Sequence, residues 1–149
     1  MERIVCVLIG YVFGLIQTGY LYGKTQHVDI RKQGSGNAGT TNALRTLGWK
    51  AGAVTFLGDC FKCVAAVVLV YFLFGRTDPE MFPVYAMYAG MGAVMGHNYP
   101  FYMNFKGGKG IAATAGLIVS TTNVWIVLIC LCVFLGIVAG TRYVSLGSL

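Results

Sequence analysis

Long apolar stretches alternate with short polar loops along this chain, which is the pattern of a polytopic membrane protein. Three stretches approach or exceed the length needed to cross a hydrocarbon core about 30 Å thick. They predict membrane helices at residues 4–22, 51–74 and 82–98. A cleaved signal peptide is the alternative for the first stretch, but its apolar run exceeds the usual core of about 7–15 residues. It also begins with Glu2 beside Arg3 rather than with a basic cluster.

The fourth apolar stretch, residues 111–139, is too long for one straight helix, which would measure about 44 Å. A polar tetrapeptide, Ser-Thr-Thr-Asn, interrupts it at residues 120–123. We expect the tetrapeptide to turn the chain and give a hairpin of two short helices, 111–119 and 124–139. Half-depth helices are acceptable where their ends meet protein or water. The alternative is a single tilted helix, which would place residues 141–149 on the opposite face.

Two kinds of residue inside these stretches bear on helix packing. Asp59 and Lys62 are three residues apart, so they share a helix face and are expected to pair. Ionisable groups within a membrane usually face the bundle interior, where they serve a function or lock helices together, and we favour the lock. The glycines at positions 90, 92 and 96 predict a close helix contact and a central place for residues 82–98.

The composition narrows the class of protein further. Hydrophobic residues make up 56% of the chain and charged residues 11%, against about 25% charged residues in soluble domains. We therefore expect an all-α integral membrane protein with one membrane domain, residues 1–149. Basic residues dominate residues 23–50, whereas residues 75–81 carry one arginine against two carboxylates. By the positive-inside rule the first loop is cytoplasmic, the amino terminus lies outside, and Lys106 and Lys109 return to the cytoplasm.

The loop at residues 34–42, Gly-Ser-Gly-Asn-Ala-Gly-Thr-Thr-Asn, has the composition of an anion site. Its glycines permit positive φ and close approach, so that successive N–H groups can surround one phosphate. Ser35 and Asn37 add side-chain donors.

A short helix is expected directly after this loop. We predict that it begins near Ala43, with Thr41 or Asn42 as its cap and Arg45 in its first turn. A helix amino terminus beside a guanidinium suits phosphate, although an ordinary helix cap uses similar residues.

A second glycine-rich loop occupies residues 105–110, Phe-Lys-Gly-Gly-Lys-Gly. It brings two ammonium groups together with glycine N–H groups. It is not a nucleotide-binding P-loop, because Lys109 is followed by Gly110 and not by serine or threonine. His97, shortly before the loop, is a candidate general base, since imidazole exchanges protons near neutral pH. A structural role at the end of a membrane helix is the alternative for His97.

Taken in order, these motifs resemble the bacterial acyl-phosphate-dependent glycerol-3-phosphate acyltransferase family. The matching residues are 34–37, 41–42 and Arg45, Asp59 with Lys62, residues 96–97 with Pro100, residues 105–110 and residues 141–145. The resemblance implies seven membrane helices around a cytoplasm-facing site. About five of them are expected in this chain: three full spans and the short-helix hairpin. Family members continue past Leu149, so the chain resembles a member truncated at the carboxyl terminus.

The resemblance also implies a reaction. A fatty acyl group passes from acyl phosphate to the 1-hydroxyl of sn-glycerol 3-phosphate, which gives lysophosphatidic acid and phosphate for phospholipid biosynthesis. It implies no metal or other cofactor, no nucleic-acid partner, contact with membrane lipid, and a monomer if the chain is complete. The expected location is the bacterial cytoplasmic (inner) membrane, with several spans and a site facing the cytoplasm.

The expected site combines this resemblance with the loop chemistry. The candidate catalytic residues are Ser35, Arg45 and His97. The residues expected to bind substrate phosphate are Gly34, Gly36, Asn37, Thr41, Asn42, Lys106, Gly107, Gly108, Lys109, Gly110 and Ser145.

A non-catalytic membrane protein is the alternative from another class. In a lipid-binding or channel-type subunit, the basic loops would grip anionic headgroups. Such a protein should lose affinity gradually with each removed cation. An enzyme should lose turnover sharply on Arg45→Ala or Ser35→Ala.

Overall fold

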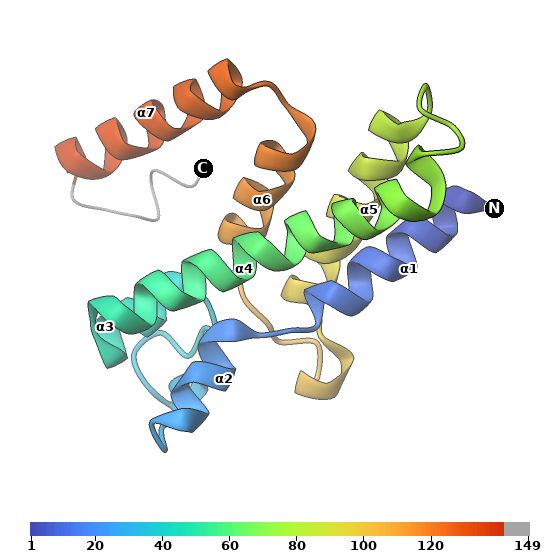
Figure 1. Cartoon of the computed structure of the whole chain (residues 1–149). Helices are drawn as coiled ribbons and strands as arrows, with labels where there is room; N and C mark the ends of the chain where they lie inside the picture. The colour runs from blue at the N-terminus through green and yellow to red at the C-terminus, as the bar shows by residue number, and fades with distance from the viewer. Residues whose placement is uncertain (142–149) are drawn as a thin grey trace.

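The computed structural model describes residues 1–141, and within them the chain forms seven α-helices and no β-strand (Figure 1). The helices are α1 (Glu2–Gly14), α2 (Thr18–Thr25), α3 (Thr40–Leu47), α4 (Trp49–Val70), α5 (Phe82–Asn98), α6 (Ile111–Thr121) and α7 (Val124–Thr141). A π-helical turn, Tyr71–Gly75, follows α4, and 3-10 turns lie at Ile30–Lys32 and Phe101–Met103. The expected all-α membrane architecture is confirmed.

Two of the expected helix boundaries are wrong. The apolar stretch at residues 4–22 is not one helix, because α1 ends at Gly14 and α2 begins at Thr18. The helix after the first glycine-rich loop begins at Thr40 and not near Ala43, and its N-cap is Gly39, with no side-chain cap. The split stretch and this short helix explain why residues 1–141 hold seven α-helices rather than five.

Three helical segments among residues 1–141 are long and apolar enough to cross a membrane: Glu2–Thr25, Trp49–Gly75 and Val124–Thr141. The helix α5, expected as a third full span, has 17 residues and so lies at the lower limit of spanning length. The stretch at residues 111–139 is divided into α6 and α7 at Thr122 and Asn123. The expectation of two helices rather than one is therefore confirmed, but α7 has 18 residues and is long enough to cross a membrane, so it is not the short helix expected.

Small residues bring α1 and α5 into close contact. A Cβ atom added at Gly10 would overlap the carbonyl group of Ala89, and one added at Gly96 would overlap that of Tyr11. Backbones can approach this closely only where side chains are absent, which is the usual basis of helix association in lipid. Since α5 also packs against α4 and α6, its expected central place is confirmed.

The bundle has a small core and an apolar outer surface. Its largest buried cluster consists mainly of small residues from α1, α4 and α5, including Cys6, Ala86 and Ala89. Large apolar side chains such as Phe61 and Trp125 point outward instead. Helix α7 buries none of its residues within the described chain. Such a surface is stable in lipid, because lipid tails are as apolar as the core.

Both glycine-rich loops lie at the same end of the bundle (Figure 1). The amino terminus and the connection between α4 and α5 lie at the other end. This arrangement brings the basic loops together, as expected from the distribution of charge. Their assignment to the cytoplasmic side stays a prediction.

Candidate functional site

A buried asparagine in the first turn of α3 holds the first glycine-rich loop. Asn42 is 2% exposed, and its amide Nδ2 donates to the carbonyl groups of Ile30 (2.8 Å) and Gln33 (3.1 Å). Its Oδ1 accepts the N–H group of Ser35 at 2.9 Å. All three contacts lie within the protein, so Asn42 fixes the loop and directs its polar atoms away from solvent. This inward rotation also explains why Asn42 does not cap the helix.

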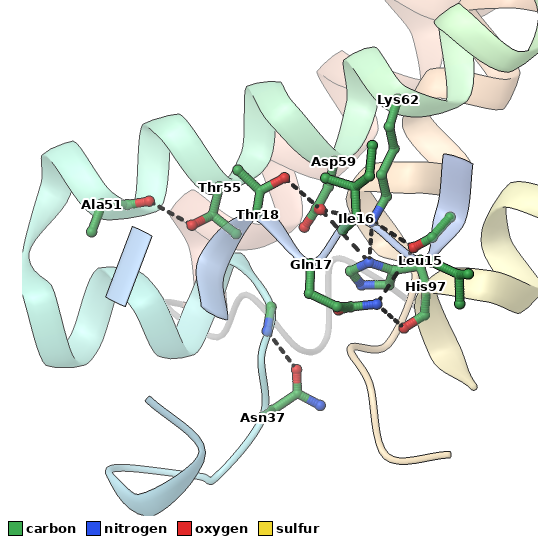
Figure 2. Close-up of polar contacts among 12 residues, drawn as sticks. Leu15, Ile16, Gln17, Thr18, Asn37, Ala51, Thr55, Asp59, Lys62 and His97 are labelled. Atoms are coloured by element: carbon green, nitrogen blue, oxygen red, sulfur yellow. Dashed lines mark hydrogen bonds and ion pairs between the residues drawn. The ribbon is translucent and has the colours of Figure 1, made fainter. Parts of the chain in front are cut away.

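The loop itself requires glycine at two positions. Gly34 and Gly36 have φ angles of 58° and 72°, in the left-handed region that other residues rarely adopt. Within the same loop, Oδ1 of Asn37 accepts the N–H group of Gly39 at 2.9 Å (Figure 2). These contacts give the loop one defined path into α3.

The amino terminus of α3 remains open to an anion. No side chain among residues 1–141 caps it, so the first N–H groups of the helix have no side-chain acceptor. Thr41 and Arg45 are four residues apart and therefore lie on one face of α3. N–H groups without a side-chain cap, a helix dipole and a guanidinium together make a favourable phosphate site.

The second loop is attached to the carboxyl end of α5. The N–H group of Gly107 donates to the carbonyl of Asn98 (3.0 Å), and that of Gly108 donates to the carbonyl of His97 (3.1 Å). A Cβ atom at Gly107 would overlap the His97 carbonyl, so only glycine permits this approach. These two N–H groups are occupied and are not available to a phosphate. Gly110, with φ of 79°, then starts α6.

Four of the expected site residues have exposed side chains whose donor groups have no hydrogen-bond or ion-pair partner within residues 1–141. They are Ser35, Arg45, Lys106 and Lys109. The nearby Arg31 differs, because it forms two hydrogen bonds, at 2.9 and 2.8 Å, with the carboxylate of Asp29. These bonds lower the pKa of Asp29 to about 2. Three of the expected site residues thus present unpaired cations beside the two ordered loops.

His97 lies inside the bundle rather than in the open part of the loop region. It is 2% exposed, and its Nδ1 is 2.8 Å from Nζ of Lys62 (Figure 2). Lys62 also pairs with Asp59 at 2.9 Å, which confirms the expected ion pair. The burial of His97 favours the structural alternative over the role of general base.

Gln17 and Thr18 are polar residues of the site region that the sequence interpretation missed. Gln17 is fully buried and donates to the carbonyl of His97 at 2.9 Å, and Thr18 donates to Asp59 at 3.1 Å. Two adjacent polar residues in an otherwise apolar stretch were the available signal for the break between α1 and α2. Ser145, expected to contact phosphate, lies outside the described residues.

Comparison with known proteins now identifies the family. The sequence profile of the glycerol-3-phosphate acyltransferases matches residues 4–149. The chain belongs to this family. A glycerol-3-phosphate acyltransferase of Thermoanaerobacter sp. (strain X514) is 43% identical over 150 residues, which cover 100% of this chain and 72% of the relative. One from Clostridioides difficile (strain 630) is 46% identical over 150 residues, which cover 97% of this chain and 71% of the relative.

Two solved structures of the family share the fold described above. Both are of PlsY, an integral membrane glycerol 3-phosphate acyltransferase. Its glycerol 3-phosphate form matches with a TM-score of 0.85 and 34% identity, over 99% of this chain and 71% of that chain. Its lysophosphatidic acid form matches with a TM-score of 0.83 and 34% identity, over 99% of this chain and 70% of that chain. The resemblance read from the motifs is confirmed.

Proposed function

We propose that this chain is a membrane acyltransferase that moves a fatty acyl group from acyl phosphate to the 1-hydroxyl of sn-glycerol 3-phosphate. The products are lysophosphatidic acid and inorganic phosphate. Membership of the glycerol-3-phosphate acyltransferase family supports the reaction. The two PlsY forms, named for glycerol 3-phosphate and lysophosphatidic acid, correspond to its acceptor and its product. The proposed location is the bacterial inner membrane, with the site toward the cytoplasm.

The observation that carries the proposal is the set of unpaired donors at one end of the bundle. The side chains of Arg45, Lys106 and Lys109 are exposed and have no hydrogen-bond or ion-pair partner within residues 1–141. The reaction requires two phosphate groups to be held at once, one on the acceptor and one on the acyl donor. Two glycine-rich loops with separate cations suit that requirement, and this match supports acyl phosphate as the donor.

Each loop then has a proposed role. Arg45 forms a fork of hydrogen bonds to the phosphate of glycerol 3-phosphate, which also meets the open N–H groups of α3. Lys106 and Lys109 neutralise the phosphate of the donor. The hydroxyl group of Ser35 donates a hydrogen bond to the oxyanion that forms at the acyl carbon. Such a hydrogen bond is worth about 3–4 kcal/mol in other enzymes.

The chemical step follows from this placement. The 1-hydroxyl oxygen attacks the carbonyl carbon of the acyl phosphate, and the bond between that carbon and the phosphate oxygen breaks. The departing phosphate takes the hydroxyl proton. Because the leaving group is already activated, alignment of the two substrates supplies most of the advantage, which can reach about 7–11 kcal/mol. No strong protein base is needed, and this agrees with the burial of His97.

Phosphate release from the purified protein tests the proposal. Protein in lipid nanodiscs receives palmitoyl phosphate with and without glycerol 3-phosphate. We expect release that depends on the acceptor and, at glycerol 3-phosphate concentrations below KM, falls by at least about 100-fold in Arg45→Ala, since loss of the contact that holds the phosphate of the acceptor lowers kcat/KM. Lys50→Ala is the matched control, because Lys50 is also exposed and cationic but lies outside both loops. Its turnover should remain close to that of the original protein.

The donor is tested in the same assay. Palmitoyl-CoA replaces palmitoyl phosphate, and lysophosphatidic acid is measured by mass spectrometry. Product from palmitoyl phosphate alone supports the proposed donor, whereas product from the thioester alone contradicts it. If neither donor gives product and each lost cation weakens vesicle binding by a similar step, the protein is a headgroup-binding relative.

A further inference from the structure

A buried polar cluster lies inside the bundle, on the two helices α4 and α5. It consists of Asp59 and Lys62 on α4 and His97 on α5, which are 1%, 3% and 2% exposed. We propose that this cluster is a positioning unit that sets the placement of the first loop relative to the second. The inference rests on the proposed function, because it assigns these residues to the alignment of two phosphate sites.

Lys62 organises the cluster by binding the break between α1 and α2. Its Nζ donates to the carbonyl groups of Gly14, at 3.2 Å, and Ile16, which a continuous helix would have used internally. The same Nζ contacts Oδ1 of Asp59 at 2.9 Å and Nδ1 of His97 at 2.8 Å. An ammonium has three N–H bonds and no lone pair, so its hydrogen bonds to Gly14, Ile16 and His97 use all of them, and Nδ1 acts as an acceptor. Asp59 is held beside them as an ion pair. The position of Lys62 therefore fixes where α1 stops.

The first connection runs from Asp59 through α2 to the first loop. Oγ1 of Thr18, the first residue of α2, donates to Asp59 at 3.1 Å. The next residue, Gly19, lies so close to the first loop that a Cβ atom there would overlap the carbonyl of Ala38. A shift of α2 would therefore move Ala38, which precedes the amino terminus of α3.

The second connection runs from His97 to the second loop. The carbonyl of His97 accepts from Nε2 of Gln17 at 2.9 Å (Figure 2). It also accepts from the N–H group of Gly108 at 3.1 Å. A Cβ atom at Gly108 would also overlap the His97 ring. One residue thus contacts Lys62, the helix break and the second loop at once.

Helix packing alone does not require these charges. The contacts of α1 with α5 are already made by glycine and alanine, and apolar residues can replace a buried ion pair with little loss of stability. The contacts of the cluster differ from this helix packing, because they lead to the second loop directly from His97 and to the first loop by way of α2. A loop that is correctly placed only part of the time lowers apparent substrate affinity in proportion to that fraction.

The test compares Lys62→Met with Thr55→Val in nanodiscs. Thr55 is a matched control, since it is also buried on α4 but its hydroxyl contacts only the carbonyl of Ala51 in the same helix. In Lys62→Met we expect amide hydrogen exchange to rise about fivefold or more in peptides covering residues 33–39 and 105–110. We also expect the KM for glycerol 3-phosphate to rise about tenfold. Partial unfolding would lower kcat and leave KM unchanged.

Several outcomes would overturn the positioning role. The first is a Lys62→Met variant whose hydrogen exchange in the two loops and whose KM for glycerol 3-phosphate both equal those of Thr55→Val. Another is recovery of both readouts in the double variant Asp59→Asn/Lys62→Met, because the effect would then come from an unpaired carboxylate. Hydrogen exchange does not depend on turnover, so it decides the inference separately. If the original protein turns over no substrate but Lys62→Met still loosens both loops, the proposed function fails and the positioning unit stands.

Discussion

The first glycine-rich loop is held mainly by one side chain, that of Asn42, whereas the second is held by backbone contacts to the helix before it. Asn42 makes three hydrogen bonds across the first loop, to Ile30, Gln33 and Ser35. In the second loop, the N–H groups of Gly107 and Gly108 bind the last carbonyl groups of α5. The first loop therefore depends on the chemistry of a single residue, and the second depends on the absence of side chains.

Replacement of the side chain that holds the first loop should have the largest effect. Asn42→Ala removes three hydrogen bonds and leaves the N–H group of Ser35 without its partner, at a cost of about 3 kcal/mol. We expect phosphate release to fall at least about 100-fold, because the loop and the start of α3 move together. Turnover and thermal unfolding in nanodiscs measure both effects.

Asn123→Ala is the matched control for this variant. Asn123 accepts the N–H group of Ile126 at the start of α7, far from the loops in sequence and at a different helix. We expect a stability loss of about 1 kcal/mol, typical of a helix cap, with turnover unchanged. Equal loss of turnover in both variants would contradict the role assigned to Asn42.

A single methyl group should break the attachment of the second loop. In Gly107→Ala the new Cβ overlaps the carbonyl of His97, which cannot move without shifting α5. We expect a destabilisation of about 1–3 kcal/mol and a turnover roughly tenfold lower. Gly136→Ala provides the comparison, since no atom of residues 1–141 lies within 4 Å of its added Cβ. If Gly107→Ala behaves like Gly136→Ala, the backbone attachment does not matter for the site.

A smaller effect is expected from the turn inside the first loop. Asn37→Ala removes one partly buried hydrogen bond, to the N–H group of Gly39, and should cost about 0.5–1.5 kcal/mol. Asn37→Asp keeps the acceptor and should preserve stability. A loss of turnover in Asn37→Asp with normal stability would indicate that the amide group itself contacts substrate.

The smallest effect concerns the ion pair beside the first loop. Hydrogen bonds from Arg31 lower the pKa of Asp29 from 3.8 to about 2. A depressed carboxyl pKa stabilises the fold above about pH 4, and this stabilisation is lost as the pH falls toward 2. Because both side chains are partly exposed, we expect no more than about 1 kcal/mol. The difference in unfolding temperature between the original protein and Asp29→Asn should therefore shrink from pH 5 to pH 2. A constant difference would contradict the ion pair.

Local patterns in the sequence were sufficient for the class of fold and for the family. Hydropathy fixes where an apolar helix can run, so the expected helix at residues 82–98 matches α5 and the polar residues near 122 mark the break before α7. The glycine-rich motifs identify the loops, because positive φ and close approach leave few alternatives to glycine. The exposed donors of Arg45 and Lys106 follow from the same motifs.

Only the tertiary structure decided how the polar residues are used. The break after α1 is stabilised by Lys62, 48 residues from Gly14, and Gln17 binds the carbonyl of His97 across 80 residues. Asn42 turns inward and His97 is buried because of partners that are distant in the sequence. Neither hydropathy nor local propensity can predict such partners. The sequence by itself therefore determined the class of fold, the two loops and the family. The fold determined which polar groups remain free to meet substrate, because a buried polar group must find its partner wherever the chain brings one.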